Sequence, residues 1–206
     1  MQPKTFLGIR AVLLMGAIIF MVSAAGFAQD TRSEVSIQGT GFFTKNSEGK
    51  GIHNDPTNSG GILVGYRYQV YRWISAEANY GYARSTQEFS GSTSARVQSN
   101  VHQATAAGVA KLPQVLKLQP FALAGGGALV FDPTLNRGGS YAGASRQTRG
   151  AFLYGAGADY PVTRYLAVRA EYRGFVYKAP SFGLDTLNTN SWTHSAQPSA
   201  GIVLKF

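Results

Sequence analysis

The chain has 206 residues, a formal net charge of +9 and no cysteine, so disulfides, thiolate metal sites and lipid attachment at a mature N-terminal cysteine are excluded. Its lysines and arginines are scattered rather than grouped in a basic run, which argues against nucleic acid as a partner. Only 14% of the residues are charged, whereas 25 are glycine and 12% are aromatic, and this composition suits the wall of a β-barrel.

The N-terminal segment has the features of an export signal. Lys4 and Arg10 form a short positive region, an uninterrupted apolar run fills 11–22, and small residues follow it. This pattern predicts a secretory signal peptide over residues 1–28, which leaves residues 29–206 as one domain. The alternative is an N-terminal membrane anchor, but the apolar run is short for a membrane-spanning helix.

Eight strands are predicted in the mature chain from the alternation of apolar and polar residues. They cover residues 34–44, 60–70, 73–84, 98–112, 118–131, 147–160, 165–178 and 192–206. The alternation is weak in the fourth and fifth strands, where alanine and glycine occupy both faces. The connections alternate between long segments rich in Gly, Ser, Asn and Thr (45–59, 85–97, 132–146, 179–191) and short ones (71–72, 113–117, 161–164). Membrane barrels have this pattern of long external loops and short periplasmic turns.

The two faces of the strands differ in character. One face is apolar and aromatic, and the other carries charges of both signs. A soluble calycin-type barrel would turn the apolar face inward, whereas a membrane barrel would turn it outward. In the membrane case five charged side chains enter the lumen and form a predicted network, namely Arg67, Glu77, Arg169, Glu171 and Arg173. We interpret this network as structural filling, and a narrow gated ion path is the alternative.

Aromatic residues near the strand ends favour the membrane arrangement. A predicted periplasmic girdle lies at the short connections and consists of Tyr71, Trp73, Tyr160, Tyr165 and Phe206. A predicted outer girdle lies near the long loops and consists of Phe43, Tyr82, Phe131, Tyr177 and Trp192. The fold class that follows is all-β, an eight-stranded antiparallel transmembrane up-and-down β-barrel closed between its first and last strands.

The last eight residues, SAGIVLKF, alternate between an apolar and a mixed face. Ser199, Gly201, Leu204 and Phe206 fill a pattern of polar, glycine, apolar and aromatic residues. This pattern resembles the C-terminal assembly signal of bacterial outer-membrane proteins. The alternative is the final strand of a soluble β-sandwich.

Four stretches carry a wider resemblance: ISAEANYGY, PFALAGGGA, YGAGADYPVTRYLAVRAEYRGFVY and SAGIVLKF. On these stretches the mature chain resembles the small outer-membrane β-barrel family of the OmpA transmembrane domain and the OmpX-like proteins. The resemblance implies the fold and a place in the bacterial outer membrane, with both termini in the periplasm, rather than an activity. Unlike full-length OmpA, the chain is expected to carry no peptidoglycan-binding domain after the barrel, so a wall-anchoring role is unsupported.

The expected function is that of a non-enzymatic outer-membrane protein that contributes to envelope integrity or to surface contact through four extracellular loops. The expected partners are outer-membrane lipids and lipopolysaccharide, the outer-membrane assembly machinery and periplasmic chaperones. No cofactor or metal is expected, because His, Asp and Glu are dispersed along the chain.

Two other functions stay open at this point. A small barrel enzyme, lipid A-modifying or protease-like, would use His102 and His194, which lie near the outer ends of their strands. A Ser-His-acid set needs mutual hydrogen-bond reach, yet Ser195 points away from His194 because adjacent strand residues face opposite sides. The remaining alternative is a soluble secreted ligand-binding barrel.

Overall fold

The structure is a computed structural model that describes residues 32–49, 52–91, 95–134, 145–182 and 191–206. The predicted signal peptide lies outside these residues. The described part of the chain contains no helix long and apolar enough to cross a membrane.

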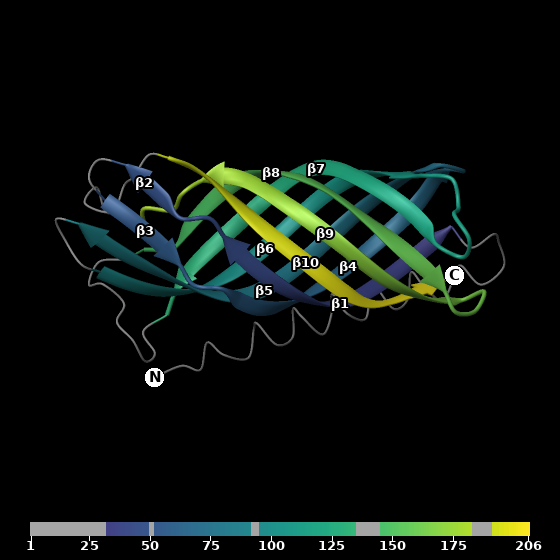
Figure 1. Cartoon of the computed structure of the whole chain (residues 1–206), viewed down its shortest axis with the longest axis horizontal. Helices are drawn as coiled ribbons and strands as arrows, with labels where there is room; N and C mark the ends of the chain where they lie inside the picture. The colour runs from purple at the N-terminus through teal and green to yellow at the C-terminus, as the bar shows by residue number, and fades with distance from the viewer. Residues whose placement is uncertain (1–31, 50–51, 92–94, 135–144, 183–190) are drawn as a thin grey trace, which may run out of the picture.

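Eight long strands close into a barrel (Figure 1). They are β1 (Ser33–Thr44), β4 (Ser59–Tyr71), β5 (Ile74–Gly91), β6 (Ala95–Lys111), β7 (Gln119–Pro133), β8 (Gln147–Pro161), β9 (Leu166–Lys178) and β10 (Trp192–Lys205). Their order around the ring is β5-β4-β1-β10-β9-β8-β7-β6, and pairing of β5 with β6 closes it. All neighbours are antiparallel, and the first strand pairs with the last, as predicted from the sequence.

Two predicted loops contain strand, which corrects the sequence-based assignment. The predicted loop 45–59 includes the short strands β2 (Ser47–Gly49) and β3 (Ile52–Pro56), and β3 pairs with β5. Most of the predicted loop 85–97 belongs to β5 and β6, which remain paired up to Phe89 and Ala95. A ladder needs only backbone hydrogen bonds, so it continues past the apolar band into polar, Ser-rich and Gly-rich sequence. That composition is also typical of loops.

The two ends of the barrel differ. At one end, which we call the turn end, lie the connections β4–β5, β6–β7 and β8–β9 together with the carboxyl terminus (Figure 1). Backbone hydrogen bonds of 3.0 and 2.9 Å join Ser33 and Phe206 there. The opposite end, the loop end, carries β2 and β3. The strand ends that the long connections join therefore lie at one end of the barrel, and those that the short connections join lie at the other.

The charged side chains of the strands lie inside, and large apolar side chains are exposed outside on β1, β4, β5, β8, β9 and β10, as in a membrane barrel. Large apolar side chains exposed on the outer wall include Tyr71 and Trp73 at the turn end and Phe43 and Trp192 toward the loop end. Two members of the predicted outer girdle were assigned wrongly, because Phe131 and Tyr177 are fully buried inside the barrel.

The cause of this error is strand parity. Phe131 has the same parity along β7 as the buried Leu129, and Tyr177 has the same parity along β9 as the buried Arg173. Successive side chains of a strand point to opposite faces, so both aromatics must enter the lumen however close they lie to a loop.

Candidate functional site

The turn-side half of the lumen is a layer of buried charges. We call the following eight side chains the charged layer: Glu34, Arg67, Glu77, Lys111, Asp159, Arg169, Glu171 and Arg173. Four are acidic and four are basic, so the formal charges cancel. All five residues of the network predicted from the sequence belong to it.

Glu77 on β5 is shared by two arginines. Its Oε2 lies 2.5 Å from Nη2 of Arg67 on the adjacent strand β4, and its Oε1 lies 2.7 Å from Nη2 of Arg173 on β9. Asn79 donates a further hydrogen bond of 2.8 Å to Oε1. Arg173 also donates from Nε to Glu171, at 2.6 Å.

A second group of contacts is centred on Arg169. Its Nε and Nη2 donate to the two carboxylate oxygens of Asp159 at 2.6 and 2.8 Å, which is a bidentate pair. Its Nη2 also donates to Glu34 on β1, at 2.9 Å. Lys111 donates from Nζ to the other oxygen of Glu34, at 3.0 Å.

Sequence reasoning missed three members of the charged layer: Glu34, Lys111 and Asp159. Strand parity already placed Asp159 on the charged face of its strand. Glu34 shares the inward parity of Ser36 and Gln38, so the same signal identifies it. Lys111 is the last residue of β6, and its membership depends on the length of its side chain, which strand periodicity does not describe.

The charged layer is stabilised by mutual pairing and by one aromatic ring. Burial of an isolated ion is costly, so each of these charges needs a partner of opposite sign. Phe121, buried in the lumen, lies beneath two guanidinium groups, with its ring centre 4.3 Å from Cζ of Arg67 and 5.1 Å from Cζ of Arg169. Cation–π attraction therefore adds to the ion pairs. The layer is a rigid, neutral filling for the barrel.

Nearer the loop end the lumen is filled by apolar side chains, which sequence reasoning did not predict. This apolar layer consists of Phe42, Leu63, Val101, Leu129, Phe131, Leu153, Phe175, Tyr177 and Phe182, each at most 1% exposed. Phe182 follows β9 and folds back into the barrel, with its N–H donating to Oε1 of Gln147 at 3.0 Å. The rings of Phe182 and Phe131 are nearly perpendicular, with 6.4 Å between ring centres.

The two histidines of the enzyme alternative lie on the outer wall. His102 forms a 2.7 Å hydrogen bond with the hydroxyl of Tyr80, and His194 a 2.8 Å bond with that of Tyr154. Their strands, β6 and β10, are separated by three strands in either direction around the ring. Ser195 points inward and bonds to the hydroxyl of Tyr177 at 2.8 Å. The structure thus keeps these groups apart.

Three residues of the predicted assembly signal lie in the turn-side half of β10, and Phe206 directly follows that strand. Ser199 points inward and donates to Oε1 of Gln38 at 3.1 Å. Gly201 packs against the backbone of β1, where a Cβ atom would collide with the carbonyl oxygen of Ile37. Leu204 is exposed on the outer wall and Phe206 is half-buried. Packing alone is therefore a sufficient reason for glycine at position 201.

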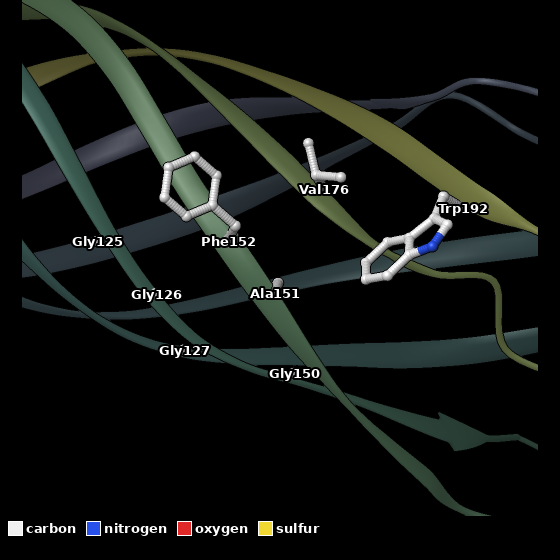
Figure 2. A pocket seen from close by; sticks show the side chains of 8 residues that line it. All are labelled: Gly125, Gly126, Gly127, Gly150, Ala151, Phe152, Val176 and Trp192. Carbon is white, nitrogen blue, oxygen red and sulfur yellow. The ribbon is translucent and has the colours of Figure 1, made fainter.

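Outside the lumen, two hollows open on the outer wall. One of about 680 Å³ spans four strands and includes Gly126, Gly150, Phe152 and Trp192 in its lining (Figure 2). Another, of about 330 Å³, has a mixed lining of polar and apolar residues. Among the described residues, no three His, Asp or Glu side chains are grouped so that they could hold a metal ion.

Comparisons with known protein families and with solved structures agree with the barrel fold described above. A family model described as "Outer membrane protein beta-barrel domain" matches residues 14–197. No curated protein gives a significant sequence match.

Solved structures resemble the chain over most of its length. Neisserial surface protein A is 15% identical, with a TM-score of 0.61, and the match covers 84% of this chain and 97% of that one. The outer membrane protein OprG from Pseudomonas aeruginosa is 13% identical, with a TM-score of 0.59 and coverages of 86% and 97%. Ail, the attachment invasion locus protein of Yersinia pestis, is 19% identical, with a TM-score of 0.51 and coverages of 86% and 100%. At these identities the likeness concerns the fold alone.

Proposed function

The chain belongs to the family of outer membrane protein β-barrel domains, and from this premise we propose that it is a non-enzymatic protein of the bacterial outer membrane. In this proposal it contributes to envelope integrity or to surface contact through four extracellular loops. The turn end faces the periplasm, so both termini of the mature chain lie there.

The filled lumen is the observation that carries this proposal. The charged layer and the apolar layer occupy the lumen one above the other, and their largest members, including Arg173, Phe131 and Phe182, are fully buried. An apolar constriction closes an ion path because it excludes water. An apolar layer above a neutralised charged layer supports a structural role for the barrel in preference to conduction.

The placement of the long connections supports a role for the loops. The strand ends that flank all four lie at the loop end, where β2, β3 and the extended β5 and β6 continue the wall. Binding residues are often carried on loops that a rigid scaffold positions. Ail is named as an attachment protein, but at its low identity the proposal rests on the loops and the lumen rather than on that name.

We also propose that Ser199, Gly201, Leu204 and Phe206 act as the signal for the outer-membrane assembly machinery, after delivery by periplasmic chaperones. The exposed apolar side chains of the outer wall make outer-membrane lipids, lipopolysaccharide among them, the immediate surroundings of the barrel.

Two measurements test the functional proposal. The purified protein in planar bilayers is expected to give no sustained conductance, and steady stepwise currents would favour the pore alternative.

A deletion strain is expected to become sensitive to detergents, with wild-type protein restoring resistance. Variants with shortened loops that still reach the membrane are expected to fail in this restoration, and full restoration would argue against a role for the loops.

The enzyme alternative has its own test. Mass spectrometry of lipid A from the deletion strain is expected to match the parent strain. A missing modification that wild-type protein restores, but that the double variant His102→Ala, His194→Ala does not, would overturn the non-enzymatic assignment.

A further inference from the structure

The outer wall differs sharply from one side of the barrel to the other. Large apolar side chains are exposed on β1, β4, β5, β8, β9 and β10, but on none of the described residues of β6 and β7. Their outward positions are instead occupied mainly by alanine and glycine, as at Ala104, Gly126 and Ala128. The outer surface of β6 and β7 therefore forms a strip of small residues, and the strands on both sides of this strip carry large exposed side chains.

The two hollows of the outer wall adjoin each other along this strip. Ala104 lines the smaller hollow and Gly150 lines the larger one. Ala128 is paired in register with both of them, with Ala104 on β6 and with Gly150 on β8. The two hollows are thus neighbours across one alanine that lines neither of them. We call the two hollows and the alanine between them the groove.

The ends of this groove differ in chemistry. Its larger hollow is apolar and lies beside Phe152, Val176 and Trp192, which Figure 2 shows on three successive strands. Its smaller hollow is lined by Tyr80, His102, Asp132 and Arg146. Arg146 is exposed. Lys178 lies at the other margin, with Nζ 5.9 Å from the ring centre of Trp192.

The groove lies at the depth where lipid headgroups meet acyl chains. A tilted strand crosses the hydrocarbon region in about 9–11 residues. His102 is the tenth residue of β6 counted back from Lys111 at the turn end, so it lies at the outer edge of that region. Arg146 precedes β8 on the loop side, which places its guanidinium at headgroup level.

We propose that this groove binds lipid A of the outer leaflet. Gly126, Ala128 and Gly150 form its floor, and Arg146 and His102 line its smaller hollow. Arginine binds phosphate through charge-assisted hydrogen bonds, and the small residues of the floor let acyl chains lie against the barrel wall. The groove has two basic groups, Arg146 at one margin and Lys178 at the other, against one acidic group, Asp132, and this balance favours a glycolipid with more than one phosphate. The inference rests on the proposed outer-membrane placement and adds a defined lipid site to it.

Trp192 provides a direct probe. The chain has two tryptophans, so Trp73→Phe leaves Trp192 alone in the groove. Protein purified from outer membranes is placed in nanodiscs of brominated phosphatidylcholine, whose acyl chains quench Trp192, and lipid A is titrated in. Selective binding restores fluorescence at lipid A fractions far below those that simple dilution of the brominated chains would require. Recovery that follows dilution alone would overturn the proposal.

Two substitutions locate the effect in the groove. Arg146→Ala is expected to raise the lipid A fraction for half-recovery about tenfold, as for the loss of one hydrogen bond to a charged group. Gly150→Phe places a ring where a Cβ atom meets nothing within 4 Å, so the barrel folds while the groove is filled and selectivity is lost. Ala122→Phe, exposed on the same wall but outside the lining, is the matched control and is expected to keep the wild-type curve.

Other occupants give distinct outcomes. Dephosphorylated lipid A is expected to lose the selectivity, and phosphatidylglycerol is expected not to replace lipid A. Equal recovery with phosphatidylglycerol would assign the groove to phospholipid and overturn the choice of lipid A. A dimer in detergent that Gly150→Phe dissociates would assign the groove to a second copy of the chain. Recovery of the protein from outer membranes tests its placement, and conductance tests the filled lumen, so failure of the proposed function is distinguishable from failure of this site.

Discussion

Arg173 on β9 reaches across the lumen to Glu77 on β5, with Nη2 2.7 Å from Oε1. Three strands separate β5 from β9 in either direction around the ring, so this ion pair joins opposite walls of the barrel. Gln103 on β6 and Gln197 on β10 form a second such link, at 3.2 Å, between strands equally far apart. The barrel is therefore braced from within as well as closed by its hydrogen-bonded ladder.

Removal of the shared carboxylate should weaken this brace. Glu77→Ala removes the closest acidic partner of Arg67 and one of the two acidic partners of Arg173, and both arginines are buried. Breaking a buried pair by removal of one member costs about 3–5 kcal/mol, because an uncompensated charge remains. We expect a loss of this size in the free energy of unfolding, measured by urea titration of the barrel in lipid vesicles.

Lys205→Ala is the control for that measurement. Lys205 lies at the end of β10, only half-buried and outside the charged layer, and its loss should change stability by no more than about 0.5 kcal/mol. If Glu77→Ala lowered the free energy of unfolding as little as Lys205→Ala, the charged layer would fill the lumen without stabilising the barrel.

Phe182 should anchor the entrance of the lumen. Its side chain is fully buried, and its carbonyl accepts from the amide of Ser145 at 2.9 Å, which connects two long connections at the loop end. Truncation of a buried phenylalanine costs about 3–5 kcal/mol when the cavity cannot collapse. We expect Phe182→Ala to lower the free energy of unfolding by about 3 kcal/mol and to speed hydrogen exchange near Ser145.

The matched variant is Phe43→Ala. Phe43 also lies toward the loop end, but its side chain is exposed on the outer wall. Its truncation should leave hydrogen exchange around Ser145 at the wild-type rate. Equal protection loss in Phe43→Ala and Phe182→Ala would mean that the apolar layer does not order the loops.

Strand periodicity predicted the ring and the character of its two faces, because a period of two assigns every side chain once the strands are recognised. The apolar layer escaped prediction for a different reason. Phe131 and Tyr177 were grouped by their distance from a loop, although parity places them beside Leu129 and Arg173 inside the barrel. The alternation alone does not say that apolar residues fill one half of a lumen and charges the other.

The missed parts of the fold depend on long-range partners. The short polar sequence of β3 has no alternation of apolar and polar residues that would predict a strand. It forms a strand because it pairs with the extension of β5. Lys111 joins the charged layer because its chain reaches Glu34 on β1, three strands away around the ring. Contacts of this kind follow from the closure of the barrel rather than from any local pattern.

Gly157 should be intolerant of a side chain. A Cβ atom there would lie 2.6 Å from Cζ of Phe121 and 2.6 Å from Cβ of Glu171, both inside the lumen. Relief of that overlap must displace the ring beneath the arginines. Overpacking of this kind costs about 1–3 kcal/mol, so Gly157→Ala should lower the urea midpoint. Gly150→Ala meets open space on the same strand and should leave the midpoint unchanged; equal midpoints in the two variants would contradict the packing argument.

Phe206 should matter more to assembly than to stability. Burial of a phenylalanine side chain contributes about 1.5–3 kcal/mol, and Phe206 is only half-buried, so the refolded barrel should survive its deletion with a small loss. The deletion also removes the two backbone hydrogen bonds between Phe206 and Ser33, but β1 and β10 remain paired along the rest of their length. Recognition by the assembly machinery, by contrast, should fail without the terminal aromatic residue. We therefore expect deletion of Phe206 to reduce the amount of protein in outer membranes far more than it lowers the urea midpoint in detergent, whereas Lys205→Ala should change neither. Normal outer-membrane levels after the deletion would show that the last eight residues act as a strand only, and the proposed signal would be lost.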